Sequence, residues 1–345
     1  MQPTVNRVMH GDNPFEVSPE LDSFQGPRTD VPRWNETFFF STWSPTTEAG
    51  VFVHTGADAA DPELFYAQLI VYLPGGELVV ERIWDRPTPP DLHVGPFSIT
   101  TKEPLRRWRL QYDGAGERTT SERAGSQPIG AGLAVPLRLD IDFVAAGPIW
   151  DMFKAGQIRH SDWSGMHHEQ ITRATGTITV ADKIYEIDGC GFRDHSTGPR
   201  DFSTIGGDRF WGLVSPTTGR GFQGLTAWKR TGELEICSAA YTIDDTFEII
   251  NGSIELTGAT DTRGNPKALD LSFTRPNGEY LQASGRILHT VTITIADPNH
   301  NINGALLDGD PLILSESQVR FDWPDGDTFY GHLERGARLT DLQIP

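Results

Sequence analysis

Short segments with alternating apolar and polar residues recur along this chain from residue 34 to residue 336. Successive side chains of a β-strand point to opposite faces, so this alternation is typical of strands. Turn-forming sequences separate the segments, such as PGG at 74–76, NG at 277–278 and DG at 325–326. The clearest segments are 34–43, 64–73, 76–84, 136–145, 175–187, 210–215, 221–230, 233–243, 246–256, 287–296 and 328–336. The pattern predicts an all-β fold of roughly sixteen to twenty strands with very little helix.

The chain has 345 residues, more than one hydrophobic core usually holds, so two domains are expected. One barrel built from all the strands would enclose a wide lumen, as in membrane porins, and the polar outer faces do not fit such a barrel. We therefore predict two tandem β-barrels of about eight to ten strands each. The first is expected to span residues 1–200, with an extended N-terminal arm, and the second residues 201–345.

The net charge of −18 argues against nucleic acid and anionic membranes as partners, because both are bound through clustered Lys and Arg. No run of 18 apolar residues occurs, so no membrane span is expected. The first residues lack the apolar core of a secretion signal. Two cysteines, Cys190 and Cys237, make neither a disulfide framework nor a cysteine-rich zinc site. We expect a cytoplasmic protein without a cofactor.

The stretch GCGFRDHSTGPRD at 189–201 concentrates charge between glycines and is the connection or the strand end between two predicted strands. If it is extended, Arg193 and His195 share one face and Asp194 points to the other. Burial raises the pKa of a carboxyl group and a nearby cation lowers it, so Asp194 has the setting of a general acid or base. An equally weighted alternative is an Arg-Asp pair that ties two domains together. Arg200 and Asp201, beyond the turn, are expected to form a surface or interdomain salt bridge.

Two further segments carry histidine and carboxylate residues. In SGMHHEQITRATG at 164–176, His167 and Glu169 lie on one strand face. A metal site needs three or four converging ligands, and no further spacing supplies them, so we expect a hydrogen-bonded pair and no metal. In FYGHLERG at 329–336, Tyr330, His332 and Glu334 share a face. The other face of that strand has the composition of a core, so this face is expected to lie outside.

The segment HHEQITRATGTITVADKIYEIDGCGFRDHSTGPRD, followed by FWG, resembles a signature of tandem lipocalin-like proteins. These proteins are related to carotenoid 1,2-hydratase (hydroxyneurosporene synthase) and to the AttH group. The likeness is greatest to an uncharacterised branch with an RDHS motif. WNETFFFSTW and PLRRWRLQYDG also fit that branch, and the resemblance runs from about residue 30 to about residue 335. One departure is Thr197, where the branch is expected to have tryptophan.

The resemblance implies two lipocalin-like barrels with a ligand site in or between them. Characterised relatives add water to isoprenoid double bonds, hydrate a prenylated flavonoid or promote cyclisations without an organic cofactor. These reactions need an acid in a dry, apolar pocket, and the 18 Phe and nine Trp residues would suit one. Only Arg193, Asp194 and His195 are carried over from the family motif, since kinship of fold does not determine function.

We therefore expect a cofactor-independent hydratase or dehydratase that acts on a hydrophobic terpenoid, steroid-like or prenylated aromatic substrate. Asp194 would donate or accept the proton with His195 as its partner, and Arg193 would hold the carboxylate or a substrate oxygen. The second-rank candidates for the pocket are His167, Glu169, Trp211 and Tyr330. Two alternatives stay open: a carrier that binds a small hydrophobic molecule without chemistry, and an isomerase, cyclase or retro-aldol lyase that uses the same pocket.

Overall fold

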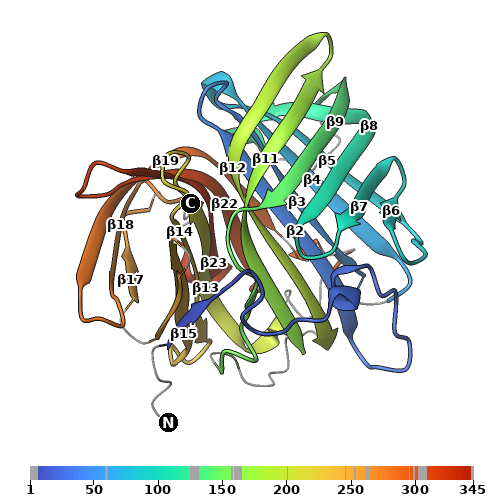
Figure 1. The fold of residues 1–345 in the computed structure, drawn as a ribbon. Helices are drawn as coiled ribbons and strands as arrows, with labels where there is room; N and C mark the ends of the chain where they lie inside the picture. The colour runs from blue at the N-terminus through green and yellow to red at the C-terminus, as the bar shows by residue number, and fades with distance from the viewer. Residues whose placement is uncertain are drawn as a thin grey trace.

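The computed structural model describes residues 7–58, 61–124, 132–156, 158, 165–199, 201–244, 246–251, 254–260, 265–294, 296–297, 300–301 and 309–342. In this part of the chain nearly every regular element is a strand, and two large antiparallel sheets lie side by side (Figure 1). The helical elements are α1 (Ser121–Ala124) and the 3₁₀ helices η1 (Pro19–Asp22), η2 (Pro74–Gly76), η3 (Phe202–Thr204) and η4 (Leu339–Asp341). The predicted all-β class is confirmed.

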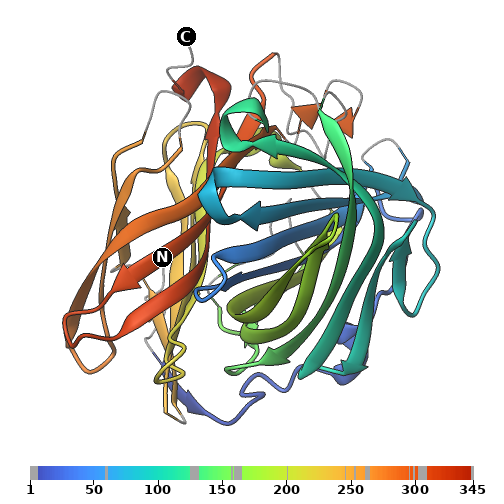
Figure 2. The same cartoon turned by 90° about the horizontal axis from the view of Figure 1, so that it is seen from above.

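The first sheet closes on itself into a barrel. Its strands are β2 (Trp34–Ser44), β3 (Ala49–Ala57), β4 (Phe65–Leu73), β5 (Glu77–Asp85), β6 (Leu92–Val94), β7 (Phe97–Glu103), β8 (Arg107–Thr120), β9 (Leu133–Ala145), β10 (Trp150–Asp151), β11 (Met166–Val180) and β12 (Lys183–Pro199). Closure follows because β9 pairs with both β8 and β11, so a ring of paired strands returns to its start. Figure 2 shows this curled blue-to-green sheet beside the yellow-to-red one.

The second sheet has the order β1-β16-β15-β14-β13-β23-β22-β19-β18-β17. Its strands are β1 (Arg7–His10), β13 (Ile205–Val214), β14 (Gly221–Lys229), β15 (Leu234–Ile243), β16 (Thr246–Asn251), β17 (Ile254–Thr257), β18 (Ala268–Thr274), β19 (Tyr280–Thr294), β22 (Leu312–Asp322) and β23 (Thr328–Arg338). The short strands β20 (Ala296–Asp297) and β21 (His300–Asn301) pair with each other. The sheet curls around its own core and makes the second lipocalin-like half.

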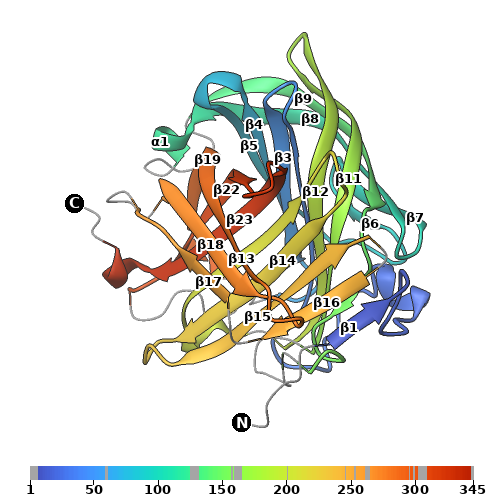
Figure 3. The same cartoon turned by 60° about the vertical axis from the view of Figure 1, so that its left-hand side comes forward.

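The N-terminal arm contacts both halves. Its strand β1 pairs with β16 of the second sheet (Figure 3), whereas η1 packs on the first barrel through Asp22, as described below. All other strands up to Pro199 belong to the first sheet, and those from Ile205 to Arg338 belong to the second sheet or to the β20–β21 pair. The division into domains 1–200 and 201–345 stays a prediction, and β1 crosses it.

Three apolar clusters follow from the alternation of side chains along the strands. One fills the first barrel and includes Phe40 and Trp108, and another fills the second half and includes Phe222. The third lies between the sheets and includes Phe192 and Phe210. The sheets approach so closely there that a Cβ atom at position 212, a glycine, would lie 2.1 Å from the Phe192 ring. The space between the sheets is therefore a packed interface, and it also holds the candidate site.

Candidate functional site

The motif at 189–201 lies mainly within strand β12. Strand β12 continues through Gly189 and Gly191 to Pro199, so the motif forms the end of a strand and the chain makes no corner at these two glycines. Their role is close approach: a Cβ atom at Gly191 would lie 2.6 Å from Thr172 Oγ1 and 2.9 Å from the Ser41 carbonyl oxygen. Since β12 stays extended, its side chains alternate, and Arg193 and His195 lie on the face opposite Asp194, as predicted.

Arg193 points into the first barrel, where it holds the N-terminal arm. Its guanidinium group lies 2.7 Å from Asp22 of η1, and both side chains are fully buried. It also stacks on Trp108 with a distance of 4.0 Å to the ring centroid. The indole of Trp108 and the backbone N–H of Leu105 donate hydrogen bonds to the same Asp22 carboxylate, at 2.9 and 2.6 Å. Arg193 therefore completes a buried network that joins the arm to the barrel wall.

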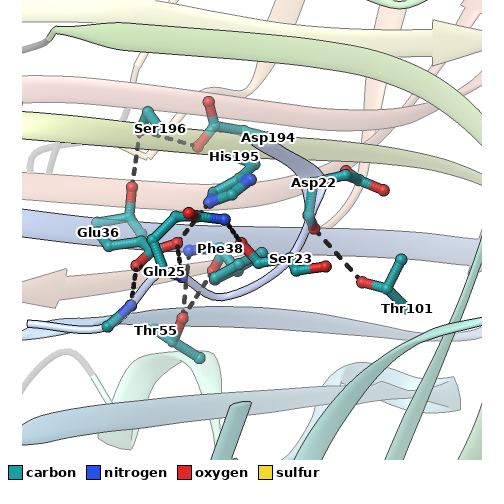
Figure 4. A network of polar contacts seen from close by, with 12 residues as sticks. Asp22, Ser23, Gln25, Glu36, Phe38, Thr55, Thr101, Asp194, His195 and Ser196 are labelled. Carbon is teal, nitrogen blue, oxygen red and sulfur yellow. Dashed lines mark hydrogen bonds and ion pairs between the residues drawn. The ribbon is translucent and has the colours of Figure 1, made fainter. Parts of the chain in front are cut away.

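His195, two residues further along β12, also contacts a buried carboxylate. Its Nε2 lies 2.9 Å from Glu36 Oε1, and its ring stacks on Phe38 at 3.9 Å (Figure 4). The Glu36 carboxylate accepts hydrogen bonds from the backbone N–H groups of Gln25 and Gly26 in the arm. Neither His195 nor Arg193 lines the cavity described next. The expectation that His195 is the partner of Asp194 is therefore corrected: the strand directs the two side chains to opposite faces.

Asp194 borders a cavity of about 140 Å³ between the two sheets. Strands β2, β3, β4, β11 and β12 form one wall, and β13, β14, β22 and β23 form the other. Most of the surface is apolar, because phenylalanine and aliphatic side chains from both sheets face inward. The apolar lining residues are Phe39, Phe52, Phe202, Ile205, Phe210, Leu225, Ala227, Leu312 and Leu314.

Asp194 has a different histidine as its partner. His167 Nε2, on the neighbouring strand β11, lies 2.6 Å from Asp194 Oδ2 and 3.2 Å from Glu169 Oε1. Burial lowers the pKa of His167, but the ion pair with Asp194 and the contact with Glu169 outweigh it and raise the pKa to about 9. Burial also raises the pKa of Glu169 to about 7, although His167 opposes this shift. His167 is therefore an imidazolium at neutral pH and is held against the Asp194 carboxylate.

Ser196 and Thr37 continue this polar wall. The Ser196 hydroxyl donates to Asp194 Oδ1 at 3.4 Å and lies 2.7 Å from the Thr37 hydroxyl of β2 (Figure 4). Both residues line the cavity. They place two hydroxyl groups beside the Asp194 carboxylate at the cavity wall.

The opposite wall supplies three further carboxyl groups, from Asp208, Glu316 and Glu334. Burial, together with the negative charges of Glu316 and Asp208, raises the pKa of Glu334 well above its usual range. Burial also raises the pKa of Asp208 to about 6, against the effect of Arg209 and of the Gly336 N–H, which donates to it at 2.7 Å. Burial and the neighbouring carboxylates therefore favour the protonated form of the Glu334 carboxyl group, which faces the cavity.

The expectation that the face of Tyr330, His332 and Glu334 lies outside is wrong. His332 is fully buried between the sheets, 3.1 Å from Glu316 Oε2 and 4.8 Å from the Phe39 ring, measured between centroids. Glu334 lines the cavity, whereas Tyr330 is half-buried and is not among the lining residues. Both faces of β23 are covered, because one packs in the second half and the other meets the first barrel.

Of the other candidates, Trp211 lies in the core of the second half and not at the cavity. Its neighbour Phe210, on the opposite face of β13, is a lining residue. Arg200 lies outside the described residues, while Asp201 pairs with Arg33 and accepts a hydrogen bond from the Ser203 N–H. Within the described residues, no group of three or more His, Cys, Asp or Glu side chains is arranged to hold a metal ion.

Sequence reasoning missed several polar lining residues: Asp208, Glu316, His54, Tyr66 and Gln68. Each lies within a strand that also carries apolar residues, on β13, β22, β3 and, for Tyr66 and Gln68, β4. Such a residue has the same pattern as a solvent-facing one, so no local signal separates them. Only a prediction of which strand faces are covered by the other sheet would have found them.

A family model described as a domain of unknown function, DUF7064, matches residues 18–336. The chain belongs to this family. No curated protein matches it in sequence. Among the described residues of this DUF7064 protein, no helix is long and apolar enough to cross a membrane.

Three solved structures share the fold at 12% sequence identity. An AttH-like protein from Nitrosomonas europaea has a TM-score of 0.62 and covers 90% of this chain and 94% of its own. Kievitone hydratase from Nectria haematococca has a TM-score of 0.58 and covers 96% of both chains. CghA with Sch210972 has a TM-score of 0.56 and covers 99% and 100%. The resemblance of the sequence to the AttH group is thereby confirmed at the level of the fold.

Proposed function

We propose that this protein is a cofactor-independent hydro-lyase that adds water to, or removes water from, a hydrophobic substrate in the cavity between the sheets. One observation carries the proposal. Glu334, whose carboxyl pKa is raised well above its usual range, lies on one wall of an apolar cavity, and the Asp194 carboxylate, in contact with His167, lies on the other. Pairs of titratable groups whose surroundings drive their pKa values apart are typical of acid–base catalysis.

In the hydration direction, the Glu334 carboxyl transfers its proton to one carbon of a substrate double bond, which leaves a cation at the other carbon. A water oxygen bonds to that cation, and the Asp194 carboxylate takes up the proton that the water then releases. A carboxylate beside an imidazolium is a weak base. A weak base suffices because the water that has bonded to the carbocation is a protonated alcohol, which is a strong acid. The proton then leaves Asp194 and one returns to Glu334 through solvent before the next turnover. Dehydration runs the same steps in reverse, from the state with Asp194 protonated and Glu334 ionised, and needs no cofactor.

The walls favour a substrate that is mostly apolar. Phenylalanine rings from both sheets line the cavity, and a cation that develops beside aromatic faces is stabilised by them. Terpenoid, steroid-like and prenylated aromatic compounds have this character. The name of one structural relative, kievitone hydratase, agrees with water addition, and this support is at the level of the fold.

The test is incubation of the purified protein with a panel of prenylated phenols, prenylated flavonoids and steroidal alcohols, followed by mass spectrometry for gain or loss of water. Asp194→Asn and Glu334→Gln should each abolish most turnover. The matched controls are Asp188→Asn and Glu186→Gln, which are exposed on the same strand β12 and should keep full turnover. If the protein binds panel members tightly and transforms none of them, the proposal fails and a carrier role replaces it.

A further inference from the structure

A row of facing residues runs across the first barrel from β11 to β5, and its four middle members line the cavity. In antiparallel sheets residues directly opposite each other point to the same face. The successive partners in the row are Glu169, Asp194, Phe39, His54, Gln68 and Arg82. Three strand intervals separate Asp194 from Gln68, a path of about 14 Å along the curled sheet. The row is therefore polar at both ends, with the Phe39 ring between.

The orientation of the Gln68 amide is determined by its neighbour. Arg82 Nη2 donates a hydrogen bond to Gln68 Oε1 at 2.8 Å. A guanidinium group only donates, so the atom facing Arg82 must be the amide oxygen, and Nε2 is the free end. Gln68 is 3% exposed and lines the cavity. Among the described residues Nε2 is buried and has no hydrogen-bond partner.

A buried donor without a partner costs free energy, and this cost is recovered when a ligand supplies an acceptor. Gln68 has polar neighbours that also line the cavity. The Tyr66 hydroxyl lies 2.7 Å from His54 Nδ1, and both residues line the cavity at this end of the row. No carboxylate belongs to the row at this end, in contrast to the end at Glu169 and Asp194.

We propose that Gln68 is a specificity-determining residue that binds an acceptor oxygen, a carbonyl or hydroxyl oxygen, at the end of the ligand remote from Asp194. The inference rests on the proposed function in that it names the substrate class of the same cavity. The substrate is then an elongated hydrophobic molecule that carries one oxygen far from the carbon that gains or loses water. Gln68 positions this molecule by its Nε2 donor and takes no part in proton transfer.

The test measures binding without turnover, by titration calorimetry with 4-acetylbiphenyl and 4-ethylbiphenyl. These probes differ in one carbonyl oxygen. The wild-type protein should bind the ketone about fivefold more tightly, the value of one neutral hydrogen bond of about 1 kcal/mol. In Gln68→Met, which keeps the volume and removes the donor, the two affinities should become equal. The matched control Gln111→Met, at an exposed position of β8, should keep the preference.

Gln68→Glu provides a second variant if Gln68→Met folds poorly. Its carboxylate keeps the contact with Arg82 and lacks the donor, so it should also lose the preference for the ketone. Equal affinities in the wild-type protein, or a ketone preference that survives in both variants, would overturn the inference. The proposed function is judged separately: Asp194→Asn should retain the ketone preference even though it loses turnover. Absence of turnover with an intact preference would reject the hydro-lyase and keep the Gln68 subsite.

Discussion

On the face of β12 that lies inside the first barrel, Arg193 and His195 each hold a carboxylate from a distant segment, Asp22 and Glu36. On the opposite face, Asp194 and Ser196 border the cavity and contact His167 and Thr37. The inner pair is enclosed by protein on all sides, and its charges serve to attach the N-terminal arm. Asp194 and Ser196 are covered by protein on one side and face the cavity, where a ligand would bind, on the other. In this short motif, Arg193 and His195 therefore hold the fold together, and Asp194 and Ser196 are the candidates for the chemistry.

The comparison predicts its largest effect on turnover at Asp194. Asp194→Asn should lower turnover per folded molecule by about 10²–10⁴-fold, the usual contribution of a general acid or base. The amide keeps the shape of the side chain but cannot accept the proton. Steady-state kinetics on a compound found in the panel measures this. An unchanged rate would remove Asp194 from the mechanism.

At Arg193 the largest effect should be on stability. Arg193→Met leaves the Asp22 carboxylate buried without its cation, so the free energy of unfolding should fall by about 3–5 kcal/mol. Urea denaturation measures the loss. The double variant Asp22→Asn with Arg193→Met should recover part of it, because no unpaired charge then remains. If Arg193→Met lost turnover while its stability stayed unchanged, Arg193 would take part in the chemistry together with Asp194.

The His167–Asp194 pair should make stability depend on pH. The pKa of His167 is raised from 6.5 to about 9 in the folded protein, so its protonation stabilises the fold fully below about pH 6.5. This contribution, roughly 3 kcal/mol, is lost as the pH rises through 9. The raised pKa of Glu169 acts in the same direction at lower pH, between about 4.5 and 7.

Urea midpoints measured from pH 6 to pH 10 would follow this loss. His167→Gln should remove the loss that follows the titration of His167. The loss that follows Glu169 should move to higher pH, because His167 no longer lowers the pKa of that carboxyl group. A variant profile parallel to that of the wild-type protein would show that His167 is not the titrating group.

His195→Leu should act mainly through the arm. Loss of the contact with Glu36 leaves a buried acceptor short of a donor and should cost about 1–3 kcal/mol. The backbone N–H groups of Gln25 and Gly26 should exchange with solvent faster, which hydrogen-exchange mass spectrometry detects. Turnover per folded molecule should stay within about threefold. A fully folded but inactive His195→Leu protein would return His195 to the catalytic group.

The smallest effect is expected at Ser196. Its hydroxyl makes a long hydrogen bond to Asp194 and a shorter contact with Thr37, so Ser196→Ala should cost about 0.5–1.5 kcal/mol of stability and a few-fold in turnover. Thermal unfolding and kinetics measure the two effects. A loss as large as that of Asp194→Asn would make Ser196 a direct participant.

Much of the fold follows from the alternation of residues along the chain. The strands, the small helical content and the split of Arg193 and His195 from Asp194 are all consequences of a period of two. The pairing of His167 and Glu169 on one face follows in the same way. Local sequence also shows that 189–201 carries charge, but it does not show that strand β12 continues through Gly189 and Gly191 to Pro199.

The tertiary structure alone decided which face of each strand meets the cavity. Alternation divides a strand into two faces but does not say which one another sheet will cover, so Glu334 and His332 had the same pattern as solvent-facing residues. It also does not say which distant groups arrive: Asp22 and Glu36 reach β12 from the other end of the first barrel's sequence. Whether a carboxyl group is an exposed anion or a buried acid depends on the removal of water by both sheets together, and no single strand contains that information.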